Sequence, residues 1–299
     1  NGDFLPDPAP QTLIDSINGA GLNPADYLVA DATSASGFVL RNPIFSQFPG
    51  GYNPNFGADL EDYAIVVGAR GDLGGFQWDF TVRSAESEAD YNISETINPS
   101  LGRLSPTSFK PGTLTQEETS VNLDFITEVE LSGLSSPLNV AFGYEWRDET
   151  YKIGAGDAAS IQAGPTAAFF GVGSDGFQGF TVASAGSFES ESNAVYVDVE
   201  SNFTDRFSAG IAVRYEDFDD FDSTSDVKLS ARYAFTEAFA VRATVNTGFR
   251  IPTPGQVNTL NVTTTSDTSG NLIPNGTYPV SNPIALTLGA IPLEPEEST

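Results

Sequence analysis

The sequence predicts an all-β fold, an antiparallel up-and-down meander of about eight strands. Apolar residues alternate with polar or small residues along eight segments, and a period of two gives each set its own face of a strand. Gly, Ser, Thr, Asn and Asp are abundant, which favours turns and long loops over helices. Short and long connections alternate between the segments, as in a meander with short connections at one end and long ones at the other.

The clearest alternation runs from Ser192 to Pro252 and contains four of the segments. In its second segment Phe207, Ile211 and Val213 share one parity, while Arg214 and Glu216 share the other. Four earlier segments behave in the same way. They are expected at about 61–70, 76–83, 118–131 and 138–149. In every segment one face is apolar, and the other carries charges, glycines and small residues.

Composition excludes several classes of function. The 299 residues contain no Cys and no His, which removes disulfides, thiolate metal sites and imidazole catalysis. Lys and Arg number 13 against 40 Asp and Glu, a net charge of −27, so we expect no nucleic-acid partner. No segment approaches the ~20 apolar residues of a transmembrane helix. The chain does not begin with Met, and we interpret it as a piece of a longer polypeptide.

The rhythm of the connections separates a membrane barrel from a soluble β-sandwich. Short connections at 71–75, 132–137, 204–206 and 236–238 fall at one end of the meander. Long ones at 92–117, 154–188 and 251–292 fall at the other, with an intermediate one at 219–225. Outer-membrane barrels have this asymmetry, with short periplasmic turns and long extracellular loops. A soluble sandwich also alternates, but unstructured loops of about 25–40 residues are uncommon in compact soluble domains.

Charged and aromatic residues favour the barrel as well. Eight of the 13 basic residues lie within segments on the polar parity, where a water-filled interior accepts them: Arg70, Arg83, Arg147, Arg214, Lys228, Arg232, Arg242 and Arg250. Five phenylalanines of the apolar parity lie beside short turns, where an interfacial girdle is expected: Phe76, Phe203, Phe207, Phe235 and Phe239. The expected fold is therefore part of a transmembrane outer-membrane β-barrel.

Four motifs resemble those of the TonB-dependent outer-membrane receptors. Phe249-Arg250-Ile251-Pro252 resembles the FRAP-type box that ends a barrel strand in that family. The stretch 293–299, LEPEEST, resembles the start of the next strand, and 143–149, GYEWRDE, resembles the family's G-x-E-x-R-x-E strand. Thr204-Asp205-Arg206 resembles a common periplasmic turn. The resemblance covers roughly residues 60–299. It implies a barrel of about 22 strands that is closed by a plug domain contacting TonB.

On this interpretation the chain has three parts. Residues 1–60 are expected to form an extracellular loop region with short helical turns at Thr12–Ile17 and Pro24–Ala30. Residues 61–250 are expected to hold eight barrel strands with their loops. Residues 251–299 are expected to form a long extracellular loop and the start of a ninth strand.

The candidate ligand-binding residues are arginines of the polar parity and aromatics beside long loops: Arg250, Arg242, Arg147, Tyr151, Phe169 and Phe170. Arginines could equally pair with acids inside the barrel, and aromatics could pack the loops together. Four carboxylates in one loop are calcium candidates: Asp217, Asp219, Asp220 and Asp222. Their spacing is not that of an EF-hand, and they could equally be ordinary solvent-exposed acidic residues of the loop.

The leading functional hypothesis is a non-enzymatic, TonB-dependent importer in the outer membrane of a Gram-negative bacterium. It would bind a scarce extracellular solute, such as a ferric siderophore or an oligosaccharide, and move it into the periplasm. The expected partners are outer-membrane lipid, a plug domain, TonB and the solute, and no cofactor is expected. Two alternatives stay open: a passive or small structural barrel, and a soluble extracellular β-sandwich that serves as an adhesin or carbohydrate-binding domain.

Overall fold

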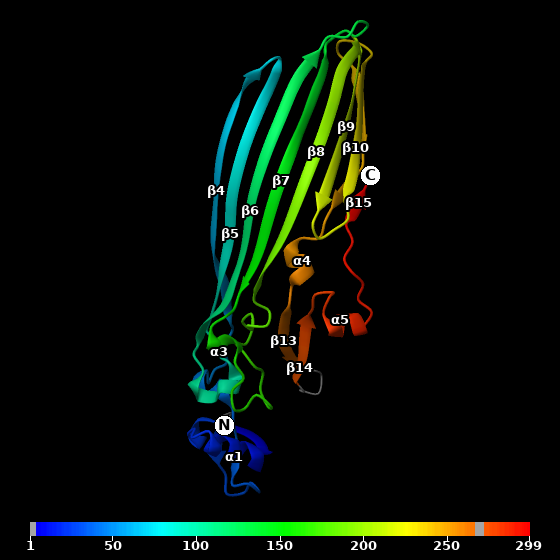
Figure 1. Cartoon of the computed structure of the whole chain (residues 1–299). Helices are drawn as coiled ribbons and strands as arrows, with labels where there is room; N and C mark the ends of the chain where they lie inside the picture. The colour runs from blue at the N-terminus through cyan, green and yellow to red at the C-terminus, as the bar shows by residue number, and fades with distance from the viewer. Residues whose placement is uncertain (1–3, 267–271) are drawn as a thin grey trace.

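One eight-stranded antiparallel sheet dominates the computed structural model, which describes residues 4–266 and 272–299 (Figure 1). Strands that are neighbours in sequence are neighbours in this sheet from β4 to β11, so the predicted all-β up-and-down meander is confirmed. Its strands are β4 (Asn55–Leu73), β5 (Phe76–Ser94), β6 (Ser108–Val129), β7 (Leu138–Gly154), β8 (Gly186–Thr204), β9 (Phe207–Phe218), β10 (Thr224–Ala234) and β11 (Ala240–Asn246). The sheet is curved but not closed.

No protein layer covers the apolar face of the sheet among the residues that the structure describes. We use this name for the side on which the aliphatic and aromatic residues lie: Ile65, Val67, Phe80, Leu123, Phe142, Val197, Ile211, Leu229 and Val241. Val67 is 66% exposed, Val195 51% and Leu229 53%. In a sandwich a second sheet would bury these side chains, and here nothing in the described part of the chain does so.

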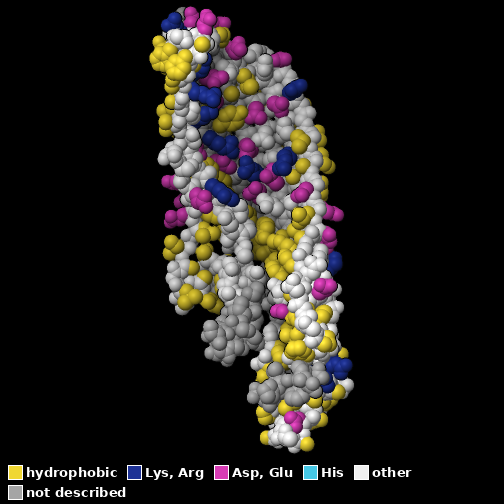
Figure 2. Space-filling model, turned by 180° about the vertical axis from the view of Figure 1, so that it is seen from behind, with side chains coloured by type: hydrophobic (Ala, Val, Ile, Leu, Met, Phe, Trp, Pro, Cys, Tyr) yellow, Lys and Arg dark blue, Asp and Glu magenta, His cyan; other side chains and the backbone are white. Residues whose placement is uncertain are grey.

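The opposite side is the charged face. It includes Arg83, Glu145, Arg147, Arg214 and Glu216, which occupy the other parity of their strands. Figure 2 shows Lys and Arg side chains interspersed with Asp and Glu over the hollow side of the sheet. One side of the sheet is therefore suited to an apolar medium and the other to water or polar protein.

The strands continue beyond the apolar part of their outer side. On β8, Val195 to Phe203 span nine residues, which at about 3.3 Å per residue and the usual tilt gives a band roughly 20 Å tall. Further from the short turns the same side becomes acidic, and we call this part the acidic band: Asp59, Glu61, Glu86, Glu88, Asp90, Glu117, Asp148, Glu189, Glu191 and Asp217. Of its carboxylates, Asp90 pairs with Lys110 at 2.9 Å and Glu117 with Lys152.

The acidic band explains where the expected strand limits were too short. The stretch 92–117 was predicted to be loop, but β5 runs to Ser94 and β6 starts at Ser108. Likewise β7 runs to Gly154, and β4 starts at Asn55. In this region the outer side is acidic, and buried apolar residues such as Ile93, Phe109 and Ile153 lie on the opposite side, so the apolar parity changes sides while backbone hydrogen bonding continues.

Residues 4–47 form a small unit beyond the long-loop end of the sheet (Figure 1). It contains a three-stranded sheet of β1 (Phe4–Pro8), β3 (Phe38–Arg41) and β2 (Leu28–Ala30), with α1 (Gln11–Gly19), η1 (Pro24–Asp26) and α2 (Pro43–Gln47). Ile17, Leu28 and Leu40 belong to its buried core. The first helical turn falls near its predicted position, but the second covers only Pro24–Asp26, because Leu28–Ala30 forms β2. The three-stranded sheet was not predicted from the sequence.

Two of the long loops are joined by a buried polar cluster centred on Asn98. Its side-chain amide donates to the carbonyl oxygens of Ala159, at 2.8 Å, and Gln162, at 2.9 Å, across the loop that contains α3 (Ala158–Ile161). Its Oδ1 accepts hydrogen bonds from Ser100, which lies in η2 (Pro99–Leu104). The hydroxyl of Thr166 donates a hydrogen bond to the backbone carbonyl oxygen of Ser100 at 3.0 Å. These loops are therefore fixed to each other rather than independent.

The chain after β11 carries short elements. They are β12 (Gly248–Arg250), α4 (Pro254–Asn258), β13 (Asn261–Ser266), β14 (Leu272–Thr277), α5 (Pro283–Thr287) and β15 (Glu296–Ser298). β15 pairs antiparallel with β12, the pairing that a ninth strand beginning there would make. None of the helices in the described ranges is long and apolar enough to cross a membrane.

We expect Asn98→Ala to loosen the two joined loops. The substitution leaves two carbonyl oxygens and the Ser100 donors without their partner in a buried site, at a cost of about 1–3 kcal/mol per unsatisfied group. Limited proteolysis and hydrogen exchange of the full-length protein should show faster cleavage and exchange across 96–107 and 158–180. Asn18→Ala, at an exposed position of α1, is the control. Equal protection in the two variants would contradict the role of Asn98.

Candidate functional site

The candidate site lies on the charged face, where β7, β8 and β9 run side by side. Glu145 on β7 and Glu216 on β9 are both register partners of Ala194 on β8. Arg147 is likewise opposite Ser192 of β8. Because β8 presents only a methyl group and a hydroxymethyl group here, long side chains from β7 and β9 can meet over it.

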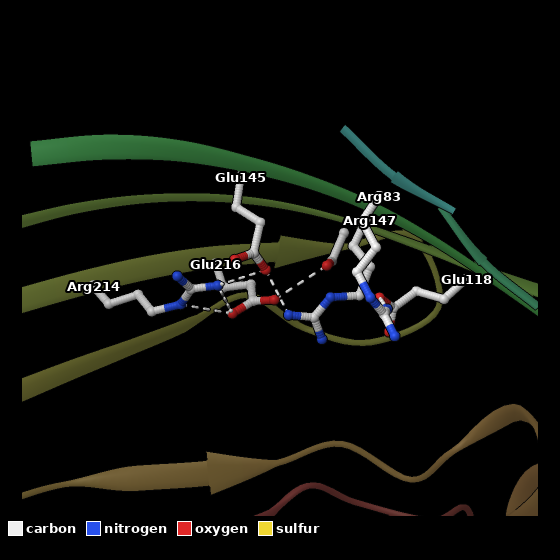
Figure 3. A network of polar contacts seen from close by, with 7 residues as sticks. Arg83, Glu118, Glu145, Arg147, Arg214 and Glu216 are labelled. Atoms are coloured by element: carbon white, nitrogen blue, oxygen red, sulfur yellow. Dashed lines mark hydrogen bonds and ion pairs between the residues drawn. The ribbon is translucent and has the colours of Figure 1, made fainter. Parts of the chain in front are cut away.

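Arg214 and Arg147 share the carboxylates of this cluster (Figure 3). Arg214 lies 3.3 Å from Glu145 and 2.9 Å from Glu216, and Arg147 pairs with Glu145. The hydroxyl of Ser192 donates to Glu216 at 3.1 Å. We call these two arginines and two glutamates the ion network. A separate pair, Arg83 with Glu118, lies beside it.

Glu216 is the most enclosed charge of the ion network. Its side chain is 7% exposed, against 31% for that of Arg214. A carboxylate withdrawn from water is stable only when it is paired and hydrogen-bonded, and Arg214 and Ser192 provide both. The network is therefore enclosed on the Glu216 side and more accessible on the arginine side.

A pocket of about 560 Å³ opens beside the ion network. Arg147, Arg214 and Glu216 form part of its wall, and Arg250 and Thr253 approach from the segment after β11. The rings of Phe218 and Phe249 also line it and meet edge to face, with centroids 5.7 Å apart. A pocket that combines guanidinium groups, carboxylates and an aromatic pair can hold a polar solute with a planar or apolar part.

The structure brings together only some of the residues selected from the sequence. Arg147 and Arg250 line this pocket, and the ring of Tyr151 packs nearby against Gly255 of α4. Arg242 lies elsewhere, in a hollow near the short turns. Phe169 and Phe170 lie in the loop between β7 and β8, where Phe169 is 37% exposed.

Most of the ion network was not recognised as a site from the sequence. Arg214 and Glu216 were recognised as residues of the polar parity, but their meeting with β7 depends on a register across three strands. The small residues Ala194 and Ser192 between longer side chains were the available signal. Only the register shows which charged residues they separate.

The calcium candidates are not arranged around a common point. Among the described residues no group of three or more acidic side chains could hold a metal ion. Asp219 instead accepts a hydrogen bond from the backbone N–H of Glu191 at 2.9 Å, which ties the β9–β10 loop to β8. In that loop burial, together with the negative charge of Asp219, raises the pKa of Asp220.

An up-and-down sheet with an exposed apolar band, a charged inner side and long loops at one end has the features of an outer-membrane barrel wall. A family model described as "TonB dependent receptor-like, beta-barrel" matches residues 10–299. The chain therefore belongs to the TonB-dependent receptor β-barrel family, as the resemblance predicted. Members of this family are transport receptors of the Gram-negative outer membrane rather than enzymes.

One solved structure supports the fold. The siderophore receptor PirA from Acinetobacter baumannii superposes with a TM-score of 0.52 at 14% identity, over 80% of this chain and 31% of that one. The RagAB peptide transporter matches with a TM-score of 0.44 at 12% identity, over 89% of this chain and 30% of that one. The chain thus spans about a third of the length of these transporters. No curated protein matches the sequence.

We expect Glu216→Ala to destabilise the barrel wall, because it leaves Arg214 half-buried with one carboxylate instead of two. Breaking a buried ion pair in this way costs about 3–5 kcal/mol. The measurement is the unfolding midpoint of the full-length receptor in detergent, followed by heat-modifiable gel mobility. Glu61→Gln, in the exposed acidic band, is the control and should leave the midpoint unchanged. Equal midpoints for both variants would show that the ion network does not stabilise the wall.

Proposed function

We propose that this chain is the central wall of a TonB-dependent transporter that captures a scarce extracellular solute and imports it across a Gram-negative outer membrane. The observation that carries the proposal is the division of the sheet into an uncovered apolar band and a charged inner face. Family membership and the long loops at one end support it. A soluble sandwich would need a second layer over residues such as Val67 and Val195, which are 66% and 51% exposed.

The pocket beside the ion network is the proposed place of solute capture. Arg147, Arg214 and Arg250 would hold acidic or electron-rich groups of the solute, and Phe218 with Phe249 would contact its planar or apolar part. Tyr151 and the loop aromatics Phe169 and Phe170 would extend the contact surface. Ferric siderophores and oligosaccharides both suit such a mixture of groups.

Active import depends on partners outside this chain. A plug domain would block the barrel, and TonB would couple its displacement to the energy of the inner membrane. The charged face would then provide a polar path from the outer loops to the periplasm. A passive barrel would differ in a measurable way, because its flux would not need energy.

Uptake assays in the native host test the proposed function. We expect cells to accumulate one member of a panel of ⁵⁵Fe-loaded siderophores and ³H-labelled oligosaccharides, and to lose this ability when the gene is deleted. A proton uncoupler should abolish the accumulation, and Arg147→Ala should weaken binding of the same solute. Uptake that survives the uncoupler would indicate a passive barrel. A full-length protein that is monodisperse in plain buffer would exclude the membrane assignment.

The position of the membrane can be tested by introducing an arginine at either of two positions on the outer side of the sheet, one in the apolar band and one in the acidic band. Val197→Arg puts a guanidinium in the apolar band and should cost about 2–4 kcal/mol, whereas the same residue near an interface costs about 0–1 kcal/mol. Asp148→Arg, in the acidic band, should therefore be tolerated. Urea unfolding of the full-length receptor in liposomes measures the difference. Equal stability of the two variants would place the membrane elsewhere on the chain.

A further inference from the structure

A second and more apolar pocket adjoins the pocket beside the ion network, which we call the capture pocket. The volume of the second pocket is about 340 Å³. Ser190 of β8 lines both pockets, so they meet at this residue. We call the second pocket the apolar compartment, because proline and aliphatic side chains form most of its wall, among them Pro252, Pro254, Val257, Val280 and Leu293.

The segment that follows β12 separates the two pockets. Ile251 and Thr253 line the capture pocket, whereas Pro252 and Pro254 line the apolar compartment. The backbone of Thr253 is extended, and an extended chain directs successive side chains to opposite sides. This short segment therefore acts as a partition with one side in each pocket.

The partition is fixed at its junction with α4. Tyr151 of β7 packs so closely on Gly255 that a Cβ at position 255 would lie 3.2 Å from the Tyr151 ring. The backbone N–H of Thr253 donates to the side chain of Gln256 at 2.9 Å, and the N–H of Gln256 donates to the Thr253 hydroxyl at 3.3 Å. This capping box sets where α4 begins. Both pockets are therefore formed before a ligand arrives, as is usual for small-molecule sites.

The charges of the two pockets favour one orientation of a ligand. Arg250 lines the capture pocket and has no carboxylate within 4.0 Å among the described residues. Its guanidinium can hold a carboxylate through two parallel hydrogen bonds. Among the described residues that line the apolar compartment, Asp220 is the one ionisable side chain. An anionic group is thus attracted to the capture pocket and repelled from the apolar compartment.

We propose that the solute is an amphiphile, with an anionic head in the capture pocket and an unbranched alkyl or acyl chain in the apolar compartment. The chain passes Ser190 and lies against Pro254 and Val257. This inference rests on the proposed function and narrows its substrate class. A metal chelator that carries an acyl chain fits both pockets, whereas an oligosaccharide leaves the apolar compartment unused.

Binding of straight-chain carboxylates tests the proposal. ³H-labelled hexanoate, octanoate, decanoate and dodecanoate are titrated onto the full-length receptor in lipid nanodiscs, and their partition into empty nanodiscs is subtracted. We expect the affinity to rise about fourfold with each added methylene, equivalent to about 0.8 kcal/mol, until the compartment is full.

Substitutions separate the head from the chain. Val257→Phe fills part of the apolar compartment, and by excluding about two methylenes it should weaken decanoate binding about fifteenfold and hexanoate binding far less. Val280→Phe is a second such variant in case the first does not assemble, which heat-modifiable mobility reports. Val182→Phe, at a position that is 76% exposed, is the matched control. Arg250→Gln should weaken binding of all four carboxylates by a similar factor.

Affinities that do not depend on chain length would overturn the proposal, and they would result if another part of the receptor fills the compartment. The same chain-length dependence in Val257→Phe, Val280→Phe and Val182→Phe would overturn it as well. Energy-dependent uptake of a solute without an alkyl chain alongside either result would show that the apolar compartment is wrong while the proposed function stands. Chain-length-dependent binding in a receptor whose uptake survives the uncoupler would support the compartment and contradict active import.

Discussion

Backbone hydrogen bonding between neighbouring strands is the interaction on which the rest of the structure depends. It holds β4 to β11 in one register, and that register decides which side chains meet on each face. In a membrane this bonding is obligatory, because hydrocarbon offers no partner to a free N–H or C=O group. The ladder passes through the apolar band and continues into the acidic band, so one set of strands would serve two environments.

On the charged face, the strand register brings charged residues from different strands together into one site. Ala194 and Ser192 are small, and their partners on β7 and β9 are long and charged. The ion network forms because these positions coincide, and a register shift of one residue would send every charge to the apolar side. At the other end of this face, small residues such as Ser208 and Ser230 separate the charged residues instead of letting them meet.

Much of the fold was predictable because a period of two survives wherever one face is apolar. The eight strands, the short turns and the aromatic residues beside them follow from that signal. The same logic failed where the outer face becomes acidic and the apolar residues, such as Phe109, move to the inner face, which is why β6 begins at Ser108 inside a stretch predicted to be loop. The three-stranded sheet near the N-terminus was also missed, because its strands have three to five residues and β1 contains two prolines.

The site was less predictable than the fold. Arg147 and Arg250 were selected as arginines of the polar parity, and they do line one pocket. Their partners could not be selected, because contacts between β7 and β9 depend on pairing across a third strand. Asp219 illustrates the reverse case. It was a calcium candidate by composition, and its carboxylate instead fixes a loop to the N–H of Glu191.

In a barrel wall of this kind the outer side of each strand would pass from lipid to water at a defined residue. Spin labels placed one at a time along β8 of the full-length receptor in bilayers measure this directly, through collision with oxygen or with a water-soluble nickel complex. Labels at positions 195, 197 and 199 should collide with oxygen, and labels at 189 and 191 with nickel. A smooth profile with no change between Asn193 and Val195 would mean that no lipid boundary lies on this part of β8.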